Sequence, residues 1–128
     1  TPAGGGNGGS GVVYVSVSQT GGLQSSMTLI SDTFTANSTP SKARIVVFAE
    51  LPDGTSDFAV SATRDNTTFN TITLTDEGYE TGSSGIKVFT GSTPLTGSAS
   101  PQVRMRWKIV GSSLTGNNKI HGVSLQWS

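Results

Sequence analysis

Seven residues near the C-terminal end, Val103-Arg104-Met105-Arg106-Trp107-Lys108-Ile109, alternate strictly between apolar and basic side chains. The four apolar residues occupy every second position, and the three basic residues occupy the positions between them. Because successive side chains of a β-strand point to opposite faces, the pattern predicts a strand with one buried face and one solvent-facing side.

A second alternating stretch follows at 119–127, after a loop-like segment rich in Gly, Ser and Asn. The pattern predicts that His121, Val123, Leu125 and Trp127 share one face of this strand. The residues Ile120, Gly122, Ser124 and Gln126 are expected on its other face. Both tryptophans of the chain lie in these two strands, which are therefore expected to carry much of the core.

Upstream, short stretches rich in β-branched and apolar residues are separated by Gly, Pro, Asn and Asp, which favours strands joined by turns. Six further strands are predicted, at 12–18, 26–35, 42–51, 57–64, 68–75 and 86–90. Long helix-forming segments are missing from the sequence. We therefore expect an all-β fold, an antiparallel, jelly-roll-like β-sandwich of about eight strands.

The domain organisation follows from composition. Residues 1–11 are dominated by glycine and are expected to form a flexible linker. Residues 12–128 are expected to form one sandwich domain, since a chain of 128 residues suits a single core.

Composition also argues against several classes of function. A formal net charge of zero gives no electrostatic footprint for nucleic acid, and no apolar run is long enough for membrane insertion. The chain has no cysteine and a single histidine, His121. Neither a cysteine nucleophile nor a multi-histidine zinc site is therefore available, and His121 is interpreted as structural. We expect no enzymatic activity, no catalytic residues and no cofactor.

Two acidic segments leave a metal site open as an alternative. One is Asp53 to Asp57, and the other contains Asp76, Glu77 and Glu80. Calcium needs six to eight oxygen ligands, and neither segment has the register of an EF-hand loop. Turn chemistry or a solvated loop is the favoured interpretation of both segments, and no metal site is predicted.

Four residues are candidates for ligand binding. Arg104, Arg106 and Lys108 form a basic stripe that suits an acidic glycan, although a solvated sheet face is the competing interpretation. Tyr79 lies in a polar segment, 76–85, that is expected to be a loop. Its ring is suited to stacking on a sugar, although a loop tyrosine that plugs one end of the sandwich is the favoured interpretation.

The stretch Thr63-Arg64-Asp65-Asn66-Thr67-Thr68-Phe69 resembles the Asp-box hairpin of sialidase-like proteins. It is one residue shorter than that motif, has Phe in place of Trp, and occurs once, whereas a propeller repeats the motif in its blades. We therefore predict a hairpin held by structural polar contacts and no sialidase activity.

Four pieces of the chain, in order, carry a wider resemblance. They are the Thr63-Arg64-Asp65 hairpin, Leu74-Thr75-Asp76-Glu77-Gly78, Met105-Arg106-Trp107-Lys108-Ile109, and the segment from Asn118 to Trp127. Together they resemble a carboxy-terminal β-sandwich domain of tailed-bacteriophage virion appendage (tail and fibre) proteins, over about 42–127. The hairpin departs from the family pattern, with Asn66-Thr67 and Phe69 in place of a Gly-Gly turn and a Trp.

The resemblance implies a non-enzymatic structural or adhesion domain on the surface of a virion. Its partners would be other virion protein subunits and host cell-surface polysaccharide, and a homotrimer would be expected. Val46 and Phe48 give the strand at 42–51 a second apolar face, which a neighbouring subunit or loops of the same chain could cover equally well. The alternative is a carbohydrate-binding module of a secreted enzyme, whose linker and fold class would look the same. A small hydrolase is a third hypothesis, which the lack of a nucleophile–base pair disfavours.

Overall fold

The computed structural model describes residues 10–13, 17–18, 26–52, 54–82, 85–112 and 118–128, with side chains from residue 26 onward. Every regular element in these ranges is a β-strand. The strands are β1 (Ser10–Val13), β2 (Val17–Ser18), β3 (Ser26–Ile30), β4 (Phe34–Thr35), β5 (Lys42–Glu50), β6 (Phe58–Thr63), β7 (Asn70–Ile72), β8 (Thr75–Tyr79), β9 (Lys87–Pro94), β10 (Arg104–Ser112) and β11 (Lys119–Trp127).

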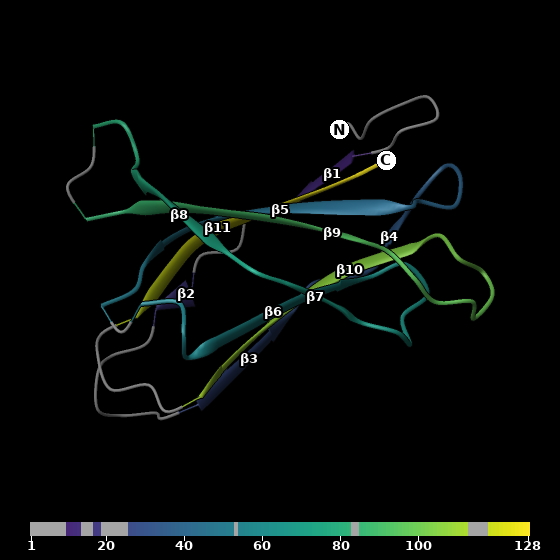
Figure 1. Ribbon diagram of the computed structural model, residues 1–128, viewed down its shortest axis with the longest axis horizontal. Coiled ribbons are helices and arrows are strands. Elements are labelled where there is room, and N and C mark those ends of the chain that lie inside the picture. The colour runs from purple at the N-terminus through teal and green to yellow at the C-terminus, as the bar shows by residue number, and fades with distance from the viewer. Residues whose placement is uncertain (1–9, 14–16, 19–25, 53, 83–84, 113–117) are drawn as a thin grey trace.

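The strands form two antiparallel sheets, which confirms the predicted all-β sandwich. One sheet has the order β1-β11-β5-β9-β8, with β2 also paired to β11. The other has the order β3-β10-β6-β7, with β4 also paired to β10. Figure 1 shows the two layers one above the other, with β5, β8 and β9 in the upper layer and β3, β6 and β10 in the lower. Strands that are consecutive in the chain repeatedly change sheet, so residues far apart in sequence meet across the core.

The core lies between the sheets and contains the face predicted from the alternation at 103–109. Trp107 is only 1% exposed, and Met105 and Ile109 are equally enclosed. The buried alternate residues of β5 pack against the same cluster. Trp127 also belongs to the core, as predicted.

A β-bulge near the start of β11 overturns the predicted placement of His121. Ile120 pairs with Ala49, but the next pair joins Gly122 to Phe48, so His121 is the extra residue. The bulge lets both Ile120 and Val123 face the core, because each lies opposite a buried residue of β5. His121 instead turns to Glu50, and its side chain is 33% exposed. Strict alternation failed here because a bulge adds one residue to one strand only.

Two predicted strands are interrupted. The strand expected at 26–35 divides into β3 and β4 because the Ser31 hydroxyl accepts a hydrogen bond from the Trp107 amide at 3.1 Å, in the place of a backbone carbonyl. The first strand, expected at 12–18, is described as β1 and β2. Since β1 begins at Ser10, its pairing reaches into the end of the predicted linker. The rest of that linker, residues 1–9, lies outside the described residues.

The segment containing Tyr79 was wrongly expected to be a loop. Thr75–Tyr79 forms β8, the edge strand of the larger sheet, and pairs with β9. Gly78 has a φ of 97° and accommodates an irregularity in this pairing. Strand β9 also runs four residues beyond the predicted end at residue 90, to Pro94.

The turn between β6 and β7 is the predicted hairpin with structural polar contacts. Asp65 is only 1% exposed, and its Oδ1 accepts hydrogen bonds from the Thr63 hydroxyl and from the amides of Thr67 and Thr68 at 2.8–3.0 Å. Its Oδ2 accepts a hydrogen bond from the Ala99 amide at 3.1 Å. Burial raises the pKa of this carboxyl, but the four hydrogen bonds outweigh it and hold the pKa at about 2.

Candidate functional site

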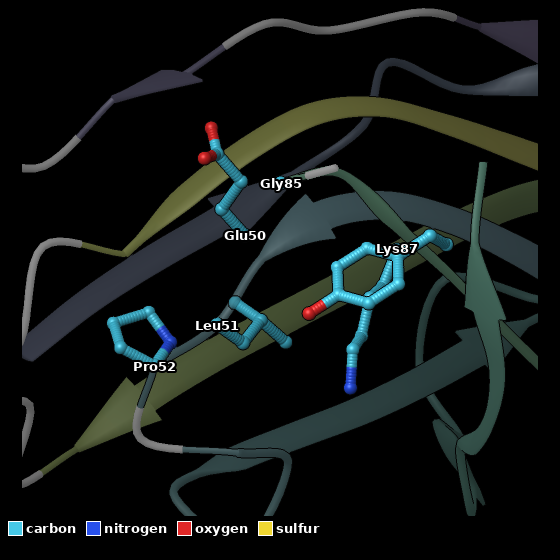
Figure 2. A pocket seen from close by; sticks show the side chains of 6 residues that line it. Glu50, Leu51, Pro52, Gly85 and Lys87 are labelled. Carbon is cyan, nitrogen blue, oxygen red and sulfur yellow. The ribbon is translucent and has the colours of Figure 1, made fainter. Parts of the chain in front are cut away.

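The candidate site is a hollow at one end of the larger sheet, beside Tyr79, which we call the Tyr79 hollow. It has a volume of about 390 Å³ and is lined by residues from the end of β5, from β8 and from the start of β9 (Figure 2). These residues are Glu50, Leu51, Pro52, Tyr79, Gly85 and Lys87. The side chain of Tyr79 is 60% exposed, so most of its surface is available to a ligand.

The arrangement follows from strand alternation and chain turns. Figure 2 shows that Glu50 and Leu51, adjacent in sequence, point to opposite sides of the chain. Leu51 packs against the edge of the core, and Pro52 begins the turn that leaves the sheet. A Cβ atom added at Gly85 would lie 2.8 Å from the Glu50 carboxylate, so glycine leaves room for that side chain. The hollow thus combines an apolar floor with a carboxylate at its rim.

Electrostatic contacts hold the aromatic ring in place. The Lys87 ammonium lies 5.2 Å from the centroid of the Tyr79 ring and 2.8 Å from the Asp76 carboxylate. The hydrogen bond to Lys87, together with one from the Gly78 amide, lowers the pKa of Asp76, and the same contact with Asp76 raises the pKa of Lys87. Both charges thus partly neutralise each other, and Lys87 orients the ring by a cation–π contact.

A second hollow, the Phe48 hollow, lies on the outer face of the same sheet, where Phe48 stands between the buried Val47 and Ala49. It has a volume of about 280 Å³ and is lined by Phe48, Glu80, His121 and Gly122. His121 Nε2 lies 2.7 Å from Glu50 Oε2. Tyr79 and Lys87 lie on the other side of the sheet, because Tyr79 pairs with Lys87 and Lys87 pairs with the buried Ala49. The bulge that displaced His121 from the core face thus brings it to the Phe48 hollow and not to the Tyr79 hollow.

The predicted basic stripe lies elsewhere, on the outer face of the smaller sheet, and two of its three residues are engaged. Arg106 donates hydrogen bonds to the Ser31 carbonyl at 2.8 Å and to Asn66 Oδ1 at 2.9 Å. The Lys108 ammonium lies 4.2 Å from the centroid of the Phe69 ring. Arg104 is exposed. These contacts tie β10 to neighbouring segments, so the stripe and Tyr79 do not form one site.

The acidic segments considered for calcium do not converge within the described part of the chain. Asp76 is bonded to Lys87, and Glu77 accepts a hydrogen bond from the Thr90 hydroxyl at 2.6 Å. Across the ranges that the structure describes, no three His, Cys, Asp or Glu side chains are grouped so as to hold a metal ion. Asp53, in the other acidic segment, lies outside the described residues.

Sequence reasoning identified Tyr79 but missed its neighbours. Glu50, Leu51 and Pro52 lie at a strand end, and only the tertiary pairing of β5 with β9 brings them to Tyr79. The one signal available in the sequence was that Leu51 and Pro52 directly follow a long apolar strand. His121 could not be placed without knowledge of the bulge.

No family model matches the chain, and neither does a curated protein or a solved structure. Among the described residues no helix could span a membrane. The interpretation of the site accordingly depends on its geometry and on the chemistry of its lining residues.

Proposed function

We propose that the chain is a non-enzymatic glycan-binding domain that uses the Tyr79 hollow. The observation that carries the proposal is an aromatic ring, 60% exposed, at the mouth of a hollow that also presents a carboxylate and an ammonium group. Sugars offer apolar C–H faces and hydroxyl groups together. A flat aromatic ring packs well against the apolar C–H face of a sugar, and charged acceptors and donors form hydrogen bonds with its hydroxyl groups.

Restriction of the Tyr79 side chain strengthens this assignment. An exposed tyrosine that moves freely would have to be ordered when a ligand binds, which weakens binding. The contact with Lys87, itself bonded to Asp76, restricts the ring before any ligand arrives. The charges of Asp76 and Lys87 also discourage the edge strand β8 from pairing with a strand of another chain. This protection does not explain why an exposed aromatic ring lies beside a hollow.

The absence of turnover is part of the proposal. Glu50, which lines the Tyr79 hollow, contacts His121. The Glu50–His121 pair has no nucleophile to activate there, because none of the described residues that line the hollow is a serine, threonine or cysteine. Incubation of the chain with chromogenic glycosides, esters and peptides should release no product above buffer. Turnover that Glu50→Gln abolishes would instead make this pair catalytic.

The strand connectivity supports a jelly-roll class, which viral and lectin domains share. In an eight-stranded jelly roll the first strand pairs with the last, the second with the seventh, the third with the sixth and the fourth with the fifth. The pairs β1–β11, β3–β10, β5–β9 and β6–β7 follow this rule when the short β2 and β4 and the edge strand β8 are set aside.

The sequence resemblance to phage appendage domains favours a virion setting, in which the domain attaches the particle to host-surface polysaccharide. Its other partners would be virion subunits, most simply two further copies of the same chain. A carbohydrate-binding module of a secreted enzyme is the second candidate, because the same site would serve it. The genes adjacent to the coding sequence separate the two: virion structural genes support the first, and a catalytic domain on the same polypeptide supports the second.

A glycan array tests the proposed function. Labelled wild-type chain should bind a defined subset of the printed glycans, and Tyr79→Ala should lose that signal while keeping its fold. Arg104→Ala is the matched control, because Arg104 is also exposed but lies on the other sheet. Loss of signal with Arg104→Ala and retention with Tyr79→Ala would move the site to the basic stripe.

A further inference from the structure

We infer that Asp76 and Lys87 act as one recognition unit, which binds two adjacent hydroxyl groups of a sugar that stacks on Tyr79. The inference deepens the proposed function and rests on it. It adds Asp76 to the site as a direct ligand contact. It also names the ligand class, sugars that carry a free pair of neighbouring, gauche hydroxyl groups.

A bulge in β8 places Asp76 and Tyr79 on the same face of the larger sheet. The two residues are three positions apart, so regular alternation would put their side chains on opposite faces. Asp76 pairs with the core residue Phe89, which places Asp76 on the inner face. Tyr79 pairs with Lys87, only two positions before Phe89, so β8 contains one extra residue. Gly78 lies at this irregularity with a φ of 97°, a conformation that glycine adopts at low cost.

The bulge brings the carboxylate, the ammonium group and the ring within reach of one sugar. Lys87 Nζ lies 2.8 Å from Asp76 Oδ2 and 5.2 Å from the centroid of the Tyr79 ring. Figure 2 shows the Tyr79 ring beside Lys87, with the Glu50 side chain pointing away from both. Because Glu50 turns its carboxylate to His121, the acceptor that accompanies the ring and the ammonium group is Asp76.

Both members of the ion pair keep hydrogen-bonding capacity for a ligand. The Lys87 ammonium has three donors, and in the described part of the chain one of them is used on Asp76. Asp76 accepts that bond on Oδ2 and a bond from the Gly78 amide on Oδ1, both at 2.8 Å, so each oxygen can accept one more. The side chains of Lys87 and Asp76 are 35% and 45% exposed, which leaves them open to a ligand.

Two adjacent hydroxyl groups of a sugar match this arrangement. One hydroxyl oxygen accepts a hydrogen bond from Lys87, while the neighbouring hydroxyl donates to Asp76. The oxygens of a gauche pair of hydroxyls lie a hydrogen-bond length apart, as Lys87 Nζ and Asp76 Oδ2 do. Each bond has one charged partner and is therefore stronger than a bond between neutral groups. A carboxylate on the ligand would instead have to compete with Asp76 for Lys87, so a neutral pair of hydroxyls fits better.

An ion pair that only protects the edge strand β8 is the competing interpretation, and single-deoxy derivatives of a glycan separate the two. The parent is the glycan with the strongest array signal, and affinities are measured by titration calorimetry. In the wild type, removal of either hydroxyl of one adjacent pair should weaken binding by roughly tenfold, because each bonds a charged group. Asp76→Ala lacks the acceptor, so the derivative without the donating hydroxyl should bind it within about twofold of the parent. Lys87→Met should become equally insensitive to loss of the other hydroxyl.

Glu77→Gln is the matched control, because Glu77 is also exposed on β8 but bonds Thr90 on the outer face of the sheet. It should keep the wild-type ratios of parent to deoxy affinity. Wild-type ratios that persist in both Asp76→Ala and Lys87→Met would show that the ion pair only supports the strand. That result, or wild-type binding that depends on no adjacent pair of hydroxyls, overturns the inference while the proposed function stands. A wild-type chain that binds no glycan removes the proposed function and the inference with it.

Discussion

The carboxylate of Asp65 accepts a hydrogen bond from the backbone amide of Ala99 at 3.1 Å, across 34 positions in the sequence. This bond joins the turn between β6 and β7 to the segment that leads into β10. Arg64, the preceding residue, reinforces the connection by donating hydrogen bonds to the carbonyls of Gly97 and Pro40. A buried ionised side chain thus ties together two segments at one end of the sandwich.

Replacement of Asp65 should therefore destabilise the fold although no function is assigned to it. In Asp65→Asn the amide nitrogen cannot accept hydrogen bonds, so at least one buried donor loses its partner, at a cost of about 2–3 kcal/mol in the free energy of unfolding. Urea unfolding followed by tryptophan fluorescence measures the change. Asp32→Asn, at an exposed position, is the control and should change the unfolding free energy by less than about 0.5 kcal/mol.

The pH dependence of stability provides a separate check on Asp65. The pKa of this carboxyl is lowered from 3.8 to about 2 in the folded chain, so its ionised form favours folding. The corresponding stability, about 2 kcal/mol, should be fully present above pH 4 and should be lost as the pH falls through 2. The difference between wild type and Asp65→Asn should shrink over that interval. A difference that stays constant from pH 5 to pH 2 would show that folding does not lower the pKa of this carboxyl.

Trp107 tests the assignment of the core face. Its side chain is 1% exposed and lies between the sheets, so Trp107→Ala should reduce the free energy of unfolding by about 3–5 kcal/mol. Thermal unfolding by circular dichroism gives the midpoint. A midpoint within about a degree of the wild type would mean that the tryptophan packs against nothing, in conflict with the fold.

Oligomeric state remains a prediction, which the resemblance to phage appendage domains motivates. Light scattering should give three times the 13.1 kDa mass of one chain. Ile30, on the outer face of the smaller sheet, is 46% exposed and is a candidate contact, so Ile30→Lys should shift the mass towards the monomer. A wild-type monomer at high concentration would contradict the trimer and would leave the glycan site unaffected.

The fold was largely predictable because its central strands bury one face each. The alternation of Met105, Trp107 and Ile109 identified both the strand and its inward side, and the structure confirms them. Strand β8 escaped prediction because it is an edge strand whose side chains are mostly solvated, so no apolar period marks it. Its cross-strand contacts, Asp76 with Lys87 and Glu77 with Thr90, are polar and are visible only once the strands are paired.

The site was less predictable than the fold because it depends on tertiary pairing. Tyr79 could be selected from sequence as an aromatic residue in a polar segment, but Glu50, Leu51 and Pro52 come from a strand end more than twenty residues away. The position of His121 depends on a single extra residue opposite Ala49 and Phe48, which no periodicity reports. The basic stripe was visible in sequence, but the acceptors that engage Arg106 come from two distant segments.

Amide chemical-shift mapping by nuclear magnetic resonance tests the central claim, glycan binding at the Tyr79 hollow, most directly. The ¹⁵N-labelled chain is titrated with the oligosaccharide that binds best on the array. The largest shifts should fall on Glu50, Leu51, Tyr79, Gly85 and Lys87. Shifts confined to Arg104, Arg106 and Lys108, or the absence of any shift at saturating oligosaccharide, would contradict the assignment.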